Sequence, residues 1–205
     1  MNFDLSEEQR EFQKVVQGFV ADAIAPNAQR WDEEHELPMD AVKQMAELGL
    51  FGLPFPEELG GSGADFLTLC LAIEEVARAD SSLAITLEAA VGLGAMPIYR
   101  FGTDEQREKW LPPLAQGDAL AGFGLTEPGS GSDAGASKTT AKLSDGEWVV
   151  NGSKSFITNS GTPITSLVTI TAVTGERDGK KEISAIIVPT GTPGFTVGNA
   201  YRKMG

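Results

Sequence analysis

Two short segments carry the residue types that could bind a flat, anionic cofactor. The first, residues 125–133, reads Leu-Thr-Glu-Pro-Gly-Ser-Gly-Ser-Asp and leaves a short apolar strand expected over Leu120, Phe123 and Leu125. Its small residues, hydroxyls and backbone N–H groups are typical of a loop that binds an anionic group. The second, residues 155–159, reads Ser-Phe-Ile-Thr-Asn and is expected to be a β-type run before a polar turn. Together they predict a site that holds a phosphate beside an aromatic ring system.

The glycine spacing excludes two common phosphate motifs. Gly129, Gly131 and Gly135 follow G-x-G-x-x-x-G, which is one residue too long for the dinucleotide fingerprint. The segment 136–145 is short and polar, and its apolar residues do not recur with the 3.6-residue period of a helix, so no crossover helix is expected. A P-loop is excluded because no Gly-Lys-Ser/Thr is present. The alternative for this motif alone is an ordinary Gly/Ser surface loop.

The two segments closely resemble the signature regions of the acyl-CoA dehydrogenase family, over Phe123–Asp133 and Asn151–Asn159. The resemblance extends along the chain and includes Leu-Ser-Glu-Glu-Gln at 5–9, Phe-Pro-Glu-Glu-Leu-Gly-Gly at 55–61 and Tyr-Arg-Lys-Met-Gly at 201–205. Two long motifs in the right order and at the right separation are more specific than the glycine pattern alone.

Composition limits the partners. The chain of 205 residues has a formal net charge of −13, which argues against nucleic acid and anionic membrane surfaces because both select basic patches. An anionic ligand such as coenzyme A must then rely on local donors. The single cysteine, Cys70, excludes an internal disulfide and fits a reducing compartment. We find no signal peptide, transit peptide or membrane-spanning apolar run, so we expect a soluble, cytoplasmic protein.

Residues before Gly117 follow a helical pattern. Capping boxes at Ser6 and Thr103 predict two helix starts, and Pro112-Pro113 is expected to end the second of these helices. Residues 82–96 are apolar nearly all round, which indicates a helix buried on most sides. Other helices are expected from Pro38 to Leu48 and from Phe66 to Ala77. The helix that starts at Ser6 is expected to bury Phe12, Val15, Val16, Phe19, Val20, Ala23 and Ile24. The helix from Phe66 to Ala77 is expected to bury Phe66, Leu69, Cys70, Ile73, Val76 and Ala77.

After Gly117 the period of the pattern changes to two. Asp145-Gly146 and Asn151-Gly152 are hairpin-type dipeptides on either side of a short strand, and further strands are expected over 166–173 and 183–188. No helical pattern separates these strands, which favours an antiparallel sheet. The fold class is therefore α+β: an all-α domain over 1–117, then an incomplete antiparallel β-barrel-like domain over 118–205. The family has its first two domains in this order.

The resemblance implies FAD as the cofactor. Thr126 and backbone amides would face the pyrimidine edge of the flavin, Ser132 would meet the pyrophosphate and the thioester, and Thr158 would bond near N5. Phe156 would pack on the ring, where many family members have tryptophan. The structural alternative is strand core for Phe156 and Ile157. The complete set of residues implied to bind FAD is Phe123, Gly124, Leu125, Thr126, Glu127, Pro128, Gly129, Ser130, Gly131, Ser132, Phe156, Ile157 and Thr158.

The resemblance also implies a reaction. An acyl-CoA thioester is oxidised to the trans-2-enoyl-CoA, as in fatty-acid β-oxidation, and electrons pass to an electron-transfer flavoprotein. The helix over 82–96 would line the acyl end of the pocket, and short or branched chains are favoured. Residues implied to bind substrate are Ser132, Thr86, Ala89, Ala90 and Leu93.

The family places its catalytic carboxylate in a third, helical domain, with much of a homotetramer interface. No catalytic base is therefore assigned in this chain, and Glu127 is expected to shape its turn. We expect the 205-residue chain alone to be poorly soluble or inert. The alternatives are an acyl-CoA oxidase or flavin monooxygenase of the same fold, or a non-catalytic flavin- or partner-binding module.

Two other residue types offer little chemistry. His35 is the single histidine and lies in the acidic run 32–36, so no metal site is expected and a solvated helix end is favoured. A Ser-His-Asp hydrolase is disfavoured by the same shortage of histidines. In addition, no serine lies in G-x-S-x-G. Cys70 lies on an apolar helix face and is expected to be in the core.

Overall fold

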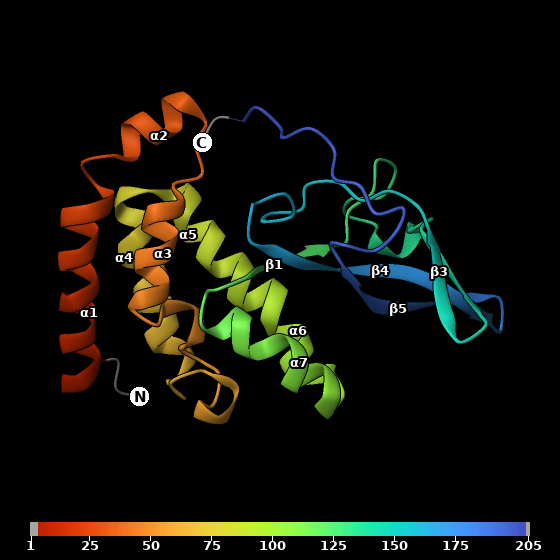
Figure 1. The fold of residues 1–205 in the computed structure, drawn as a ribbon, viewed down its shortest axis with the longest axis horizontal. Helices are drawn as coiled ribbons and strands as arrows, with labels where there is room; N and C mark the ends of the chain where they lie inside the picture. The colour runs from red at the N-terminus through yellow and green to blue at the C-terminus, as the bar shows by residue number, and fades with distance from the viewer. Residues whose placement is uncertain (1–3, 204–205) are drawn as a thin grey trace. The chain divides into compact units, whose positions relative to one another are not determined.

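The computed structural model describes residues 4–203, which divide into two compact units (Figure 1). Of the described residues, 4–119 and 199–203 form the helical unit, and 120–198 form the sheet unit. The expected order, an all-α domain followed by a β domain, is confirmed. Met204 and Gly205 of the expected terminal motif lie outside the described residues.

The helical unit contains seven α-helices, two π-helical segments and two short 3-10 turns within its described part. Their bounds are α1 Glu7–Phe19, η1 Val20–Ile24, α2 Ala28–Glu34, α3 Met39–Glu47, η2 Leu50–Gly52, η3 Glu57–Leu59, α4 Phe66–Ala79, α5 Ser81–Glu88, η4 Ala89–Ala95, α6 Met96–Phe101 and α7 Asp104–Ala115. Helix α2 was not predicted from the sequence, and His35 caps its C-terminal end with a left-handed φ of 55°. His35 is exposed, so the expected solvated helix end is confirmed.

Both predicted capping boxes are present. The Ser6 hydroxyl accepts a bond from the Gln9 N–H, and the Ser6 N–H donates to Gln9 Oε1. Thr103 and Gln106 repeat this arrangement at the start of α7. Each box satisfies two N–H groups that have no partner inside the helix, which fixes the first turn.

Helix α7 continues through Pro112 and Pro113 to Ala115, so the expected stop at the prolines is wrong. Leu111, Leu114 and Ala115 are buried around this turn. Their burial offsets the hydrogen bonds that the two prolines cannot donate.

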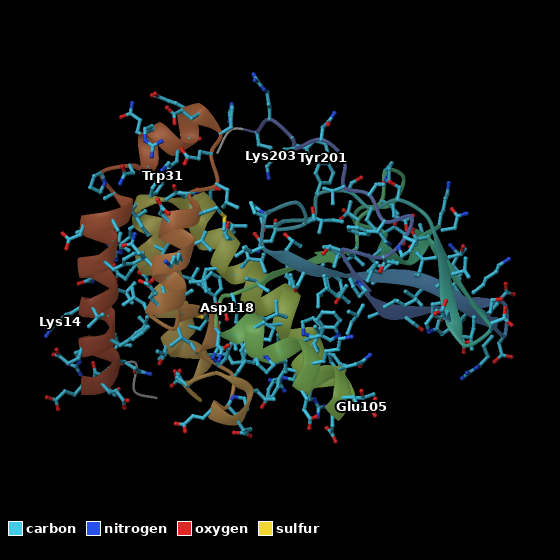
Figure 2. The ribbon with its side chains drawn as sticks, viewed as in Figure 1. Lys14, Trp31, Glu105, Asp118, Tyr201 and Lys203 are labelled. Atoms are coloured by element: carbon cyan, nitrogen blue, oxygen red, sulfur yellow. The ribbon has the colours of Figure 1, made fainter. Side chains whose placement is uncertain are left out.

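Helix α4 buries Leu69 and Val76 of the expected core face, whereas Phe66, Cys70 and Ala77 of that face are exposed. Glu75 is buried, and its carboxylate accepts bonds from Gln13 and Gln17 of α1. These amides let a charged residue enter the interface, which shifts the buried stripe toward Leu71 and Ala72. Cys70 is consequently exposed, and its expected core position is wrong. Unlike Glu75, the charged side chains of Lys14 on α1 and Glu105 on α7 point away from their helices toward the surface (Figure 2).

Helices α5, η4 and α6 join into one helical run over Ser81–Phe101. This run of 21 residues contains an 18-residue stretch with a mean hydropathy of 1.4, which is long and apolar enough to cross a membrane by length and composition, so the expectation that no such run exists is wrong. Of that stretch, 56% is buried inside the protein, as in a core helix. Leu83, Leu87 and Ile98 contribute to the core of the helical unit.

The sheet unit is built from five strands: β1 Leu120–Gly124, β2 Thr140–Ser144, β3 Glu147–Asn151, β4 Thr165–Arg177 and β5 Lys180–Pro189. Strand β2 was not predicted from its polar sequence. The long strand β4 is central: β5 pairs with it antiparallel, whereas β1 and β2 pair with it parallel. The sheet is therefore mixed, and the expectation of purely antiparallel pairing is wrong. The chain passes from β1 to β4 through the motif loop, the β2–β3 hairpin and a further irregular segment, without a crossover helix, so the sequence pattern does not indicate that β1 and β4 pair in parallel.

Tight turns set the hairpin registers. Asp145 and Gly146 have φ values of 52° and 85° and join β2 to β3, as predicted. Asp178-Gly179 joins β4 to β5 in the same way, although that turn was not predicted. The second expected hairpin dipeptide, Asn151-Gly152, instead leads from β3 into an extended segment. A Cβ on Gly152 would lie 2.3 Å from Thr139 Oγ1, so close backbone approach explains this glycine.

Candidate cofactor site

The two motifs meet at strand β1. A Cβ on Gly122 would lie 2.9 Å from Ile157 Cγ2, and one on Gly124 would lie 3.2 Å from Ile157 Cδ1. The glycines of β1 therefore leave space for the second motif to cross it. Residues 152–157 form no strand, so the expected β-type run is wrong, and Ile157 is held by packing on β1 in place of a strand ladder.

Two hydrogen bonds tie the motifs together beyond the end of β1. The Ser155 N–H donates to the Thr126 carbonyl over 2.8 Å. Lys154 Nζ donates to the Leu125 carbonyl over 3.2 Å. The separation between the first motif and Phe156 is therefore set by neighbouring backbone and side-chain contacts.

A tight turn shapes the first motif. The Glu127 N–H donates to the Ser130 carbonyl, and the Ser130 N–H donates back to the Glu127 carbonyl. Pro128 and Gly129 occupy the two exposed positions between them, where proline suits the first corner of a turn. The Ser130 hydroxyl is buried and donates to the Asp133 carbonyl over 2.6 Å, so it serves the loop itself.

The Glu127 carboxylate is buried and bound on both oxygens. Oε1 accepts from Lys154 Nζ at 2.8 Å, Ser137 Oγ at 2.6 Å and the Thr139 N–H at 2.9 Å. Oε2 accepts from the Lys138 N–H at 2.7 Å. Burial alone raises the pKa of Glu127, but the bonds from Lys154, Ser137 and the two amides outweigh it and hold that pKa far below its usual range.

A carboxylate this acidic is a poor proton acceptor near neutral pH. The geometry supports the expectation that Glu127 shapes the loop, because it joins the turn to residues 137–139 at the other end of the same loop. Glu127 is thus a structural anchor for the first motif.

Free donors remain on the exposed side of the loop. Among residues 4–203, the N–H groups of Thr126, Gly131 and Ser132 have no hydrogen-bond acceptor, and the hydroxyls of Thr126 and Ser132 are likewise uncommitted. A Cβ placed on Gly129 or Gly131 meets no atom within 4 Å, and neither glycine has a positive φ. The chain's own packing therefore does not require these glycines. Small residues and free N–H groups facing open space fit close approach by an anionic group such as a flavin pyrophosphate.

The second motif presents an exposed aromatic ring. Phe156 is 69% exposed and has a φ of 58°, in the left-handed region that bulky residues rarely adopt. Phe156 is therefore not core, whereas the half-buried Ile157 is. The half-buried Thr158 begins the expected polar turn. Backbone strain at an exposed aromatic residue is common where a ligand is bound.

The residues implied to bind the acyl chain lie on one helical run of the helical unit. Thr86 is on α5, and Ala89, Ala90 and Leu93 are on the π-helical segment η4. Thr86, Ala89 and Ala90 are buried, and Leu93 is 45% exposed. The Thr86 hydroxyl donates to the Ser82 carbonyl. π-helical segments are rare and often occur at functional sites.

Sequence reasoning missed Lys154, Ser137 and Thr139 as parts of this site. The side chain of Lys154 is 5% exposed, whereas an isolated lysine in a polar segment is usually predicted to lie on the surface. The one signal in the sequence was its position two residues before Phe156, within the second motif region.

The chain matches two family models. The model described as acyl-CoA dehydrogenase, N-terminal domain, matches residues 6–118, and the model described as acyl-CoA dehydrogenase, middle domain, matches residues 122–205. A probable acyl-CoA dehydrogenase of Bacillus subtilis, YngJ, is 52% identical over 206 residues, with 100% of this chain and 54% of the relative covered. The chain thus spans about half the length of the curated relatives that it matches.

Solved structures show the same likeness. Butyryl-CoA dehydrogenase from Megasphaera elsdenii superposes with a TM-score of 0.94 at 41% identity, covering 100% of this chain and 54% of that one. An acyl-CoA dehydrogenase from Bacillus anthracis, solved in complex with FAD, has a TM-score of 0.88 at 39% identity, covering 98% and 34% respectively.

Proposed function

Because the chain belongs to the acyl-CoA dehydrogenase family, we propose that it supplies the flavin- and substrate-binding regions of an enzyme that oxidises an acyl-CoA thioester to the trans-2-enoyl-CoA. One observation carries the proposal. The first motif exposes free N–H groups on Thr126, Gly131 and Ser132 beside two glycines with open space above them. This arrangement suits FAD, and a relative was solved with that cofactor.

Five motif residues would hold FAD. The Thr126 N–H and hydroxyl would stabilise negative charge at the pyrimidine edge of the ring, as donors do in an oxyanion hole. Gly131 and Ser132 would hold the pyrophosphate, and the Ser132 hydroxyl would also bind the thioester. Phe156 would pack on the ring, and Thr158 would donate near N5. When bound, FAD supplies the acceptor for the hydride that leaves the substrate β-carbon.

The substrate we propose is a short or branched acyl-CoA. Leu93 is the one exposed residue among the four implied on the helical run, so we assign it the contact with the acyl end. The relative solved as a butyryl-CoA dehydrogenase supports a short chain. No residue among 4–203 is assigned as the base that takes the α-proton, because the four donors to Glu127 hold its pKa far below the ordinary value and leave it a poor proton acceptor.

The proposal extends to partners. We propose that electrons leave to an electron-transfer flavoprotein, that the protein acts as a homotetramer and that it is cytoplasmic. The single cysteine of the chain fits a reducing compartment.

Flavin binding and reduction by substrate test the function. The protein, purified as its source makes it, is incubated with excess FAD, separated from free cofactor and mixed anaerobically with butyryl-CoA. We expect visible flavin absorbance that butyryl-CoA bleaches and that returns slowly in air. Rapid reoxidation with peroxide formation would instead identify an oxidase. Bound FAD without bleaching by any acyl-CoA would indicate a binding module, and absence of flavin absorbance would refute the cofactor assignment.

A further inference from the structure

One edge of strand β4 is shared by two strands, with a gap between them. Strand β1 pairs along this edge as far as Ile170, and β2 meets it at Val173. The gap lies at Thr171 and Ala172. Lys154 enters it and donates to Thr171 Oγ1 over 3.1 Å, with only 5% of its side chain exposed.

Lys154 and Glu127 form a buried ion pair at this gap. Their atoms Nζ and Oε1 are 2.8 Å apart, and the Glu127 side chain is 6% exposed. Lys154 Nζ also lies 3.3 Å from Ser137 Oγ. Burying two charges has a large desolvation cost, and removing one partner leaves the other uncompensated. Such a pair in the middle of a sheet edge must hold its neighbours in a narrow range of positions.

The bond from Lys154 to the Leu125 carbonyl has a directional effect on the first motif. That carbonyl belongs to the same peptide group as the Thr126 N–H. In a planar trans peptide the C=O and the N–H point in opposite directions, and the described chain has no cis peptide. Because Lys154 draws the Leu125 carbonyl inward, the Thr126 N–H is turned outward, where it has no acceptor in the described chain.

The Glu127 end of the pair fixes the rest of the loop. Its carboxylate binds the hydroxyl of Ser137 and the N–H groups of Lys138 and Thr139, which immediately precede β2. The loop over 128–136 is therefore closed at its base, while Gly129, Gly131 and Ser132 stay exposed.

We propose that Lys154 and Glu127 are positioning residues for the flavin: the pair aims the Thr126 N–H at the ring and holds the glycine loop in its binding conformation. This inference rests on the proposed function. It assigns cofactor affinity and redox tuning to two side chains that face the interior and do not touch the flavin. Since a donor at the pyrimidine edge favours the negatively charged reduced ring, a misdirected N–H makes bound FAD harder to reduce.

The test compares four variants for FAD affinity and flavin reduction potential. Lys154→Met removes the ammonium, and Glu127→Gln/Lys154→Met removes both charges, so the double variant leaves no uncompensated buried charge. Lys154→Arg keeps the charge. Lys142→Met removes an exposed lysine of β2 and is the matched control.

We expect both Met-containing variants of Lys154 to bind FAD about tenfold more weakly or worse, by analogy with the loss of affinity when a residue that orients a metal ligand is removed. The bound flavin should have a more negative potential in both. Lys154→Arg should recover part of the affinity, and Lys142→Met should match the wild type. A residue with only a stability role would lower the melting temperature and leave the FAD dissociation constant and the potential unchanged.

The outcomes separate the two proposals. Wild-type protein that takes up no FAD refutes the proposed function and the positioning role with it. Wild-type protein that binds FAD, with unchanged affinity and potential in Lys154→Met, refutes the positioning role alone. Where Lys154→Met does not fold, the same values measured on the double variant decide.

Discussion

Replacing Glu127 with glutamine should destabilise the sheet unit by an amount that depends on pH. The side chain keeps its shape, and an amide oxygen at the position of Oε1 still accepts from Ser137, Thr139 and Lys154. The amide NH₂ then faces the Lys138 N–H, where two donors meet. Lys154 also loses its counterion while it stays buried.

The expected cost follows from that geometry. Breaking a buried ion pair by removing one partner costs about 3–5 kcal/mol in the free energy of unfolding. Loss of the Lys138 bond accounts for part of this cost, since a hydrogen bond to a charged group contributes about 1.5–3 kcal/mol. For a domain whose stability is about 5–15 kcal/mol, the change is large.

The pH dependence has a definite sign. Glu127 has its pKa lowered in the folded protein from the ordinary value of 4.5. Its contribution is therefore complete above that value and is lost as the pH falls toward the folded pKa. The loss is about 1.4 kcal/mol per pH unit, so it reaches about 2 kcal/mol between pH 4.5 and about pH 3. Glutamine does not titrate, so the difference in the free energy of unfolding between wild type and variant, called the gap below, should narrow by this amount as the pH falls.

Denaturant unfolding across this pH range measures the gap directly. Glu147→Gln is the matched control because Glu147 is an exposed carboxylate on β3, and its effect should stay within about 0.5 kcal/mol. A gap below about 1 kcal/mol at neutral pH, or one that does not change between pH 4.5 and about pH 3, would refute the assignment of Glu127 as an ionised structural anchor.

Four further changes test other parts of the structure. Gly131→Ala should leave the melting temperature unchanged, because its Cβ meets no protein atom, yet weaken FAD binding measured by titration; equal affinity would show that the flavin does not approach this glycine. Gly152→Ala should lower the free energy of unfolding by about 1–3 kcal/mol, because its Cβ would lie 2.3 Å from Thr139 Oγ1, and a neutral result in denaturant unfolding would contradict that contact. Thr103→Ala should cost about 1 kcal/mol in the same assay through loss of the helix cap, and Thr103→Ser should restore most of it. Cys70 should react with a thiol reagent in the native protein as fast as in denaturant, since it is exposed; protection in the native state would return it to the core.

Local features of the fold could be predicted from the sequence because their causes are local. The capping boxes at Ser6 and Thr103 and the Asp145-Gly146 turn depend on residues within four positions of one another. The direction of strand pairing could not be predicted. Strands β1 and β4 are far apart in the chain, and no local pattern shows how two such strands pair. The resemblance of the two motifs to a known family predicted where a cofactor loop would lie, but not the buried contacts that hold this loop in place.

The burial of three charged residues was not predicted from the sequence. Glu75, Glu127 and Lys154 are all buried, and hydropathy assigns each of them to the surface. Their burial depends on partners far along the chain, such as Gln13 for Glu75 and Ser137 for Glu127. Long-range polar networks of this kind become visible only when the fold brings the partners together.

The parallel pairing of β1 with β4 also implies an order of folding for the sheet unit. Arg177 pairs with Lys180 across a two-residue turn, so the β4–β5 hairpin can form from neighbouring residues. Leu120 pairs with Thr165, and this ladder requires closure of the whole intervening segment. Distant pairings form late because the loss of chain entropy precedes the gain in contacts. Both motifs lie within that segment, so we expect them to come together late in the folding of the sheet unit, when β1 pairs with β4.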